Sequence, residues 1–389
     1  MKITRVEPLL LVGEMNAQRQ YLCVRVHTDE GIVGLGEVGF TPKALALIAY
    51  LSDLNHQLIG RNPHDIEAIW QYLYRQPYER GGPIILSAIA GIDMALWDIL
   101  GKSLGVPSYR LWGGPTRDRV PVFASLNLSR DIEENLDSVR GVVARGFRAL
   151  RVPLSDYLVG LPVRQLAREI SKQIEKIRET VGDEIDLAID IHRRCRVHEA
   201  LAVCHALEPF GLLFVEDPIM AENMDALAEI ARRTTIPIAT GENLYTPYQF
   251  RDLFAKRAVR FARIDLCLAG GISAGLKIAH LAEMEFIHVI PHHPWGPVAT
   301  AAYAHFSASI HNLEILEYNM ETVPGASVIV NQPVTFKDGY LEVPQTPGLG
   351  IELNEEYVKH SAARYSGPDA QTINQNPVLY RRDGTLTDW

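Results

Sequence analysis

Three carboxylates stand at the ends of successive apolar segments in the middle of the chain, where they could bind a divalent cation. Asp190, Glu216 and Glu242 follow one another at intervals of 26 residues. Mg²⁺ prefers oxygen ligands and keeps some coordination positions open for water or substrate. One such aspartate could equally cap the next helix or pair with an arginine, but three at matching places favour a metal site. We therefore predict that these carboxylates bind one Mg²⁺ per subunit.

The series continues into groups that are suited to proton transfer. Asp265, His292 and Glu317 follow at intervals of 23, 27 and 25 residues, and His192 stands two residues after Asp190. A carboxylate beside an imidazole fixes its tautomer and raises its basicity, as a general base requires. We predict that Asp265 and His292 form such a pair, that Glu317 is a further catalytic candidate, and that His192 points to the same side of an extended chain as Asp190. The alternative is that His292 caps the following helix while Asp265 pairs elsewhere.

The segments that carry these residues have the pattern of a parallel β-barrel. Short apolar runs alternate with amphipathic helical segments, and the runs are residues 120–125, 149–154, 185–190, 212–216, 236–239, 261–265, 286–291 and 314–317. Alternation of strands and helices indicates a parallel sheet, and eight strands close a barrel. An open doubly wound sheet is the competing arrangement, but no glycine-rich dinucleotide turn follows the first strand. We predict an α/β protein with a (β/α)7β-type TIM barrel over residues 119–345, whose mouth gathers the polar residues.

The first part of the chain has a different pattern, typical of a small α+β domain. Residues 2–12 read as a strand, and residues 21–27 and 32–38 read as a hairpin around Asp29-Glu30-Gly31. Helical periodicity follows over residues 42–58, 66–74 and 85–104, and Gly113-Gly114-Pro115 marks the change to the barrel pattern. We predict an N-terminal capping domain over residues 1–118. The segment 346–389 should pack back on that domain.

Composition and charge exclude several classes of partner. The 389 residues are 47% hydrophobic and 22% charged, with a formal net charge of −9. This composition is typical of a soluble protein with more than one domain, and the negative charge disfavours nucleic acid or anionic membranes as partners. The apolar stretches near residues 9–12 and 84–100 are interrupted by polar residues before they could span a bilayer, and the four cysteines show no CxxC spacing. We expect a cytoplasmic homo-oligomer that acts on a small molecule.

The motifs around these residues resemble those of the enolase superfamily, and within it those of the acid-sugar dehydratases of the galactonate type. In the barrel they are Asp190-Ile191-His192, Val215-Glu216-Asp217-Pro218, Gly241-Glu242-Asn243, Asp265 ahead of Ala269-Gly270-Gly271, and Pro291-His292-His293-Pro294-Trp295-Gly296-Pro297. Outside the barrel, Arg80-Gly81-Gly82-Pro83, residues 91–98 and Pro347-Gly348-Leu349-Gly350 resemble segments of the same family. The resemblance therefore covers nearly the whole chain.

The resemblance implies an enzyme that removes the α-proton of a sugar acid and eliminates the 3-hydroxyl, leaving a 2-keto-3-deoxy acid. It implies that the three carboxylates hold the Mg²⁺ that binds the substrate carboxylate. It further implies that His292, paired with Asp265, abstracts the α-proton and that His192 protonates the departing hydroxyl. An α-proton of a carboxylate is very weakly acidic, so cationic stabilisation of the developing charge agrees with this chemistry.

One position departs from other members of the superfamily. Many of its racemases and cycloisomerases carry a Lys-x-Lys pair at the end of the second strand, where this chain has Arg151 and Pro153. Proline cannot act as a base, which disfavours racemisation. Arg151 is always protonated and suits a carboxylate clamp, although a structural salt bridge is an equal alternative. Arg19 and Arg80, in two polar loops, and Trp295 are further candidates for substrate binding.

Two other interpretations stay open. The enzyme could dehydrate another aldonate (mannonate, gluconate or a pentonate), or act as a racemase or epimerase. A protein of another class, which binds metal and a sugar acid without turnover, would be expected to have lost its base or its acid, and the sequence retains both.

Overall fold

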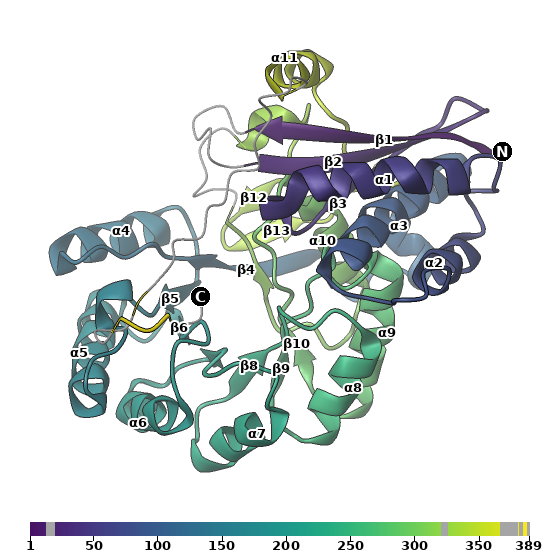
Figure 1. Cartoon of the computed structure of the whole chain (residues 1–389). Helices are drawn as coiled ribbons and strands as arrows, with labels where there is room; N and C mark the ends of the chain where they lie inside the picture. The colour runs from purple at the N-terminus through teal and green to yellow at the C-terminus, as the bar shows by residue number, and fades with distance from the viewer. Residues whose placement is uncertain (13–19, 320–325, 366–379, 381–383, 387–389) are drawn as a thin grey trace.

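The computed structural model describes residues 1–12, 20–319, 326–365, 380 and 384–386. Arg19, a predicted substrate-binding residue, lies outside the described residues. A capping domain of three strands and three helices sits beside a larger barrel (Figure 1). Each has its own cluster of buried apolar side chains.

The capping domain is an antiparallel sheet backed by helices, as the sequence pattern predicts. Its strands β1 (Ile3–Val12), β2 (Gln20–Thr28) and β3 (Val33–Val38) pair in that order. Its helices are α1 (Ala44–Leu58), α2 (Ile66–Arg75) and α3 (Pro83–Leu104). By length and composition α3 could cross a membrane, contrary to the interruption expected from its polar residues, but 78% of its most apolar window is buried inside the fold. It is the central helix of this domain.

Two glycines let β3 lie directly on α3. A Cβ atom at Gly34 would stand 2.0 Å from the carbonyl oxygen of Ala95, and one at Gly36 would stand 1.9 Å from that of Gly91. Real Cβ atoms do not approach backbone oxygens so closely, so only glycine permits this contact. The contact fixes how the end of β3 faces the barrel.

The barrel is a ring of short parallel strands. Its strands are β4 (Arg119–Ser125), β5 (Ala149–Pro153), β6 (Asp186–Asp190), β7 (Val215–Glu216), β8 (Ile238–Thr240), β9 (Phe261–Ala262), β10 (His288–Val289) and β11 (Leu316–Glu317). Each pairs with the next as far as β10, and β11 pairs in parallel with β4. The chain that leads into β11 forms a parallel bridge from Leu313 to Val289 of β10, so backbone hydrogen bonds connect the two ends of the run. The predicted (β/α)7β architecture is confirmed.

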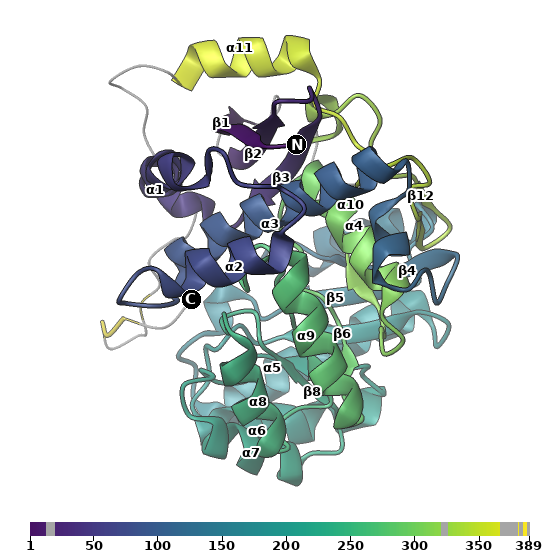
Figure 2. The ribbon, with the colours of Figure 1, turned by 90° about the vertical axis from the view of Figure 1, so that its right-hand side faces the viewer.

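Seven helices alternate with the barrel strands and cover their outer side (Figures 1 and 2). They are α4 (Ile132–Ala144), α5 (Val163–Val181), α6 (Val197–Leu207), α7 (Met224–Arg233), α8 (Pro247–Ala255), α9 (Gly271–Met284) and α10 (Pro297–Ser309). A separate cluster of buried side chains comes from the strands themselves, including Phe123, Phe214 and Ile290. These residues fill the interior beneath the mouth, so the barrel is a packed core with its site at one end.

The last part of the chain returns to both domains. The hairpin of β12 (Phe336–Lys337) and β13 (Tyr340–Glu342) extends the sheet at β4. The helix α11 (Glu355–Tyr365) lies over the capping sheet (Figure 2), where Glu355 forms an ion pair with Arg25. Short 3₁₀ helices occupy several connections: Thr41–Lys43, Ser108–Trp112, Asp156–Leu158, Glu208–Phe210 and Ala326–Ile329.

The close approach of β3 to α3 gives a direct test of this packing. Gly36→Ala should lower the free energy of unfolding by about 1–3 kcal/mol, because the added methyl group overpacks the contact with Gly91. Gly141→Ala is the matched control, since Gly141 is exposed within α4 and a Cβ there meets no atom within 4 Å. It should raise stability by about 0.5–1 kcal/mol through helix propensity. Urea denaturation of both variants measures the difference, and equal effects would contradict the packing.

Candidate active site

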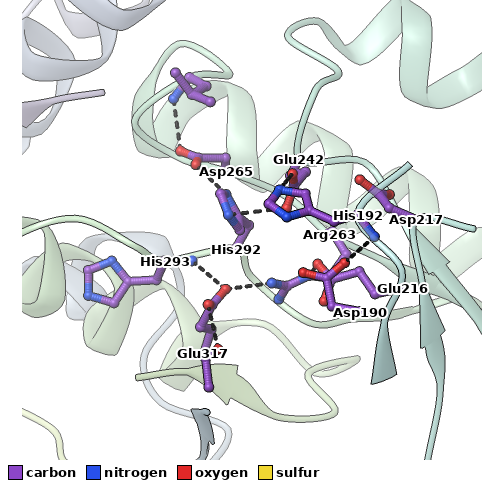
Figure 3. Close-up of polar contacts among 12 residues, drawn as sticks. Asp190, His192, Glu216, Asp217, Glu242, Arg263, Asp265, His292, His293 and Glu317 are labelled. Carbon is purple, nitrogen blue, oxygen red and sulfur yellow. Dashed lines mark hydrogen bonds and ion pairs between the residues drawn. The ribbon is translucent and has the colours of Figure 1, made fainter. Parts of the chain in front are cut away.

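The predicted metal-binding carboxylates lie together at the carboxyl ends of the barrel strands. Asp190 ends β6, Glu216 ends β7 and Glu242 follows β8 by two residues. All three lie at the mouth, with Asp190 beside Glu216 and Glu242 next to the histidines (Figure 3), and they are 4%, 0% and 6% exposed. Burial disfavours the ionised form and raises the pKa of Asp190 and of Glu216, although neighbouring arginines oppose this effect. These carboxylates need positive charge close by.

Arg263 supplies the most deeply buried of those charges. Its Nε stands 2.5 Å from Oε1 of Glu216, and its Nη2 stands 2.5 Å from Oε2 of Glu317. Its Nη1 donates to the backbone carbonyls of Ile290 and Pro291, both at 3.0 Å. The side chain is fully buried, so the guanidinium is held on every side. Sequence reasoning missed this residue, although an arginine within the apolar run 261–265 was a usable signal.

Arg151 lies on the opposite side of the same carboxylates. Its Nη1 is 2.7 Å from Glu216 and 3.4 Å from Asp190, and its Nη2 is 3.0 Å from Glu317. The guanidinium that we predicted to clamp the substrate is thus engaged with three protein carboxylates, as the salt-bridge alternative describes. Burial opposes ionisation of Glu317, but Arg151 and Arg263 outweigh it and hold the pKa of Glu317 well below its usual range. Glu317 is therefore an anion that anchors both arginines.

The expected pair of His292 and Asp265 is present in the geometry. Nδ1 of His292 lies 2.7 Å from Oδ2 of Asp265, and the Asp265 carboxylate also accepts from the indole of Trp295 at 2.9 Å and the hydroxyl of Tyr303 at 3.0 Å. The other ring nitrogen, Nε2, faces the mouth 3.2 Å from Oε2 of Glu242. Burial lowers the pKa of His292, but Glu242, Asp265 and Glu317 outweigh it and raise the pKa to about 9.

His192 reaches the same carboxylate by a different route from the one predicted. The chain turns at the end of β6 instead of staying extended: His192 has φ +57° and Arg193 has φ +65°. The turn is closed by the backbone N–H of His192, which donates to Oδ1 of Asp190 at 2.8 Å. The imidazole then stands with Nε2 3.8 Å from Oε1 of Glu242. Burial is the main cause that lowers the pKa of His192 to about 4.

Arg193 and Asp217 complete the network and were also missed by sequence reasoning. Nη1 of Arg193 lies 2.7 Å from Oδ2 of Asp217 and forms an ion pair with Glu242. Asp217 also accepts from the Thr240 hydroxyl. Burial and the charge of Glu242 raise the pKa of Asp217 to about 7, against the opposing charge of Arg193. Both residues directly follow predicted site residues, so their proximity was foreseeable, but their pairing was not.

The donor set fits a divalent cation, although it is not arranged as a ready cluster. Across the described parts of the chain, no three His, Cys, Asp or Glu side chains are grouped so that one ion could contact them all. Arg151 bridges Asp190 and Glu216, whereas Glu242 is paired with Arg193 and lies beside both imidazoles. The network contains six carboxyl groups and three guanidiniums, so its acidic groups outnumber its permanent positive charges by three. Buried oxygen donors with uncompensated negative charge are what Mg²⁺ binds.

The remaining predicted residues differ in their relation to this network. Trp295 belongs to it through Asp265. Arg80 is exposed, and among the described residues it forms no ion pair with the network. Its role in substrate binding stays a prediction.

Comparisons with known proteins identify the family of the chain. Residues 2–113 match the mandelate racemase / muconate lactonizing enzyme N-terminal domain, and residues 134–357 match the enolase C-terminal domain-like family. The chain is 35% identical to a D-galactonate dehydratase of Xanthomonas campestris and 33% identical to one of Ralstonia nicotianae, with full coverage of both chains in each case. Among solved structures, an enolase of Agrobacterium radiobacter with bound sodium and L-malate superposes with a TM-score of 0.92, at 31% identity and full coverage of both chains. The 3,6-anhydro-D-galactonate cycloisomerase of Zobellia galactanivorans gives 0.83, at 30% identity over 93% of this chain and 99% of that one.

Proposed function

The chain is an enzyme of the mandelate racemase / muconate lactonizing enzyme family of the enolase superfamily, and from this membership we propose that it is a Mg²⁺-dependent dehydratase of a sugar acid. It would remove the proton next to the substrate carboxylate and eliminate the 3-hydroxyl, giving a 2-keto-3-deoxy acid. The observation that carries the proposal is the buried His292–Asp265 pair, in which Nε2 of His292 lies 3.2 Å from Glu242, one of the proposed metal ligands.

The three strand-end carboxylates would hold the metal. When bound, Mg²⁺ supplies the positive charge that attracts the substrate carboxylate and stabilises the negative charge that develops as the α-proton leaves. Arg151 and Arg263 hold Glu216 from two sides and keep it oriented toward the mouth. Glu242 would exchange its ion pair with Arg193 for the metal, and Asp217 remains as the partner of that arginine.

His292 is the proposed base, and its Nε2 is the atom that would take the α-proton. A base must be unprotonated, whereas the pKa of about 9 keeps His292 protonated at pH 7 in the absence of a cation. Much of that rise comes from the anionic Glu242. If Glu242 were neutralised as a metal ligand, its attraction for the imidazolium would weaken and the pKa of His292 would fall, which favours the unprotonated ring that a base requires. Asp265 meanwhile holds the Nδ1–H tautomer, which leaves Nε2 toward the substrate.

His192, on the other oxygen of Glu242, is the proposed acid for the departing hydroxyl. Its pKa of about 4 leaves it neutral at pH 7, which opposes this role. The competing route is that His292 returns the proton it has abstracted to the leaving hydroxyl. The two routes differ in whether His192 is needed for elimination.

The substrate would be an aldonate. The relatives of highest identity given above are D-galactonate dehydratases, which makes D-galactonate the first choice. Mannonate, gluconate and pentonates have the same reacting groups and stay as alternatives. Racemisation is disfavoured because Pro153 offers no second base. A purely binding role is disfavoured because the base and its orienting carboxylate are both in position.

The first test is turnover itself. Purified protein with Mg²⁺ should convert D-galactonate, or another member of an aldonate panel, into a 2-keto-3-deoxy acid that is detected as its semicarbazone. EDTA should stop the reaction, and His292→Asn should abolish it because no other described imidazole is paired with Asp265. Failure of every aldonate, with metal bound, would contradict the proposed dehydratase.

The metal ligands can be tested without a substrate. Glu216→Gln should weaken Mg²⁺ binding by more than the roughly 10–100-fold that is typical of losing an outer-shell partner, because a charged ligand oxygen is lost. Isothermal titration calorimetry measures the affinity, and Glu229→Gln, an exposed change on α7, is the control. Unchanged affinity in a folded Glu216→Gln protein would remove Glu216 from the ligand set.

The role of His192 separates elimination from simple enolisation. If His192 is the acid, His192→Asn should reduce formation of the keto acid by about 10²–10⁴-fold, while exchange of the α-proton in D₂O persists and Mg²⁺ affinity is unchanged. Proton NMR follows exchange and product in the same tube. Product formation at the wild-type rate would instead assign both proton transfers to His292.

A further inference from the structure

Two barrel helices, α9 and α10, follow Asp265 and His292 in the chain, and neither has a capping side chain of its own. The first residue of α9 comes directly after Gly270 and six residues after Asp265. The first residue of α10 comes directly after Gly296, at the end of the loop that carries His292. Other barrel helices provide their own caps: α4, α7 and α8 are capped by Asp131, Asn223 and Thr246. The first N–H groups of a helix have no partner within the helix and must find one elsewhere when buried.

For α10 the partner is a carboxylate of the capping domain. Glu37, on β3, is fully buried and accepts from the backbone N–H of Gly296 at 2.5 Å and from that of Ala299 at 2.9 Å. A negative charge at a helix N-terminus is favourable because it meets unpaired N–H groups and the positive end of the helix dipole. Position 296 has to be glycine, since a Cβ atom there would stand 2.6 Å from Oε1 of Glu37 and 2.5 Å from the ring of Tyr21.

For α9 the partner is a second carboxylate of the capping domain. Asp93, on α3, accepts from the backbone N–H of Ser273 at 3.0 Å and from its hydroxyl at 2.5 Å. The same hydroxyl accepts from the indole of Trp97 at 2.9 Å, and the indole of Trp70 donates to the carbonyl of Gly270 at 2.6 Å. Figure 2 shows α3 and α9 close together, as these contacts require.

The start of α10 connects directly to the His292–Asp265 pair, and the loop before α9 does so through the backbone N–H of Leu268, which donates to Oδ1 of Asp265 at 3.0 Å. Trp295 immediately precedes Gly296, and its indole donates to Asp265. Tyr303, on α10 itself, donates to the same carboxylate. A displacement of the first turn of α10 therefore moves two of the donors that fix Asp265, and Asp265 fixes the imidazole of His292.

We propose that Glu37 and Asp93 are positioning residues, through which the capping domain holds the His292–Asp265 pair in its working geometry. The assignment of His292 as the base rests on the proposed function, whereas the positioning itself does not. A misplacement of about 1 Å at a reacting group can cost about 10²-fold in rate, so the effect on catalysis would be large for a residue that never touches the substrate.

The capping domain contains a matched control for this idea. Asp98, also on α3, is a third buried carboxylate of the capping domain, and it accepts from the backbone N–H groups of Leu35 at 2.9 Å and Leu349 at 2.7 Å. It also pairs with Lys102. These partners lie in β3 and the C-terminal segment, away from the loops of Asp265 and His292. Loss of Asp98 should affect stability without reaching the base.

The experiment compares Glu37→Gln, Asp93→Asn and Asp98→Asn by NMR of [¹⁵N]histidine-labelled protein at one pH, without metal or substrate. The Nδ1–H signal of His292 is assigned by its loss in His292→Asn. In Glu37→Gln and Asp93→Asn this signal should shift or disappear through exchange with water, because Asp265 is no longer held. In Asp98→Asn it should stay at the wild-type position, even if unfolding occurs at lower urea.

A wild-type signal in Glu37→Gln, or an equal change in Asp98→Asn, would overturn the proposal. If a variant does not fold, Ser273→Ala replaces it, since it removes one of the groups that bind Asp93 and leaves the carboxylate in place. A shift in that variant supports the proposal, and an unchanged signal contradicts it. With an active substrate in hand, Glu37→Gln should lower kcat by about 10²-fold with little change in KM. Because the NMR measurement needs no turnover, its failure is separate from failure of the dehydratase assignment.

Discussion

The structure depends on accommodating six buried carboxyl groups at one end of the barrel. Removing a charge from water costs several kcal/mol per ion unless close partners replace the solvent. Arg263 replaces the solvent at the centre of the site. Its guanidinium forms ion pairs with both Glu216 and Glu317, and its remaining nitrogen donates to backbone carbonyls. An arginine suits this task because its charge is permanent and its donors are fixed in a plane. The strands β7, β9 and β11 are thereby held at the spacing that the mouth requires.

The same charges decide what chemistry the site can carry out. The arginines are fewer than the carboxylates, and the excess negative charge accounts for both the attraction of a cation and the raised pKa of His292. His192 lies against the other oxygen of Glu242 but is controlled by its burial, so its pKa moves in the opposite direction. One carboxylate thus separates two imidazoles with different proton affinities. A cation bound at Glu242 would lower the pKa of both imidazoles. Metal binding and proton transfer would therefore be electrostatically coupled.

The sequence predicted the parts of this arrangement that follow from periodicity. A strand and a helix together take about 25 residues, so polar residues recurring at that interval had to reach one end of the barrel, and Asp190, Glu216 and Glu242 do so. Pairing between strands leaves no periodic signal, which is why Arg263 and Arg193 were missed. The position of His192 required knowing that the chain turns with positive φ after β6, where an extended chain was assumed. The burial that lowers the pKa of His192 likewise could not be predicted, because it arises only when the barrel is folded.

The contacts between the two domains could not be predicted from any local sequence pattern. They connect the capping domain to the barrel helices that follow Asp265 and His292. Glu37 and Gly296 are 259 residues apart, and Asp93 and Ser273 are 180 apart. Glu37 reaches the barrel because glycines let β3 lie flat on α3, and Asp93 reaches it from α3 itself. The barrel helices α9 and α10 have glycines where α4, α7 and α8 have capping side chains, and carboxylates of the capping domain accept from their first turns instead. When the capping domain covers these N–H groups it excludes water from them, and the carboxylates of Glu37 and Asp93 replace that water as acceptors. Docking of the two domains and the placement of the helices that follow Asp265 and His292 therefore depend on the same hydrogen bonds.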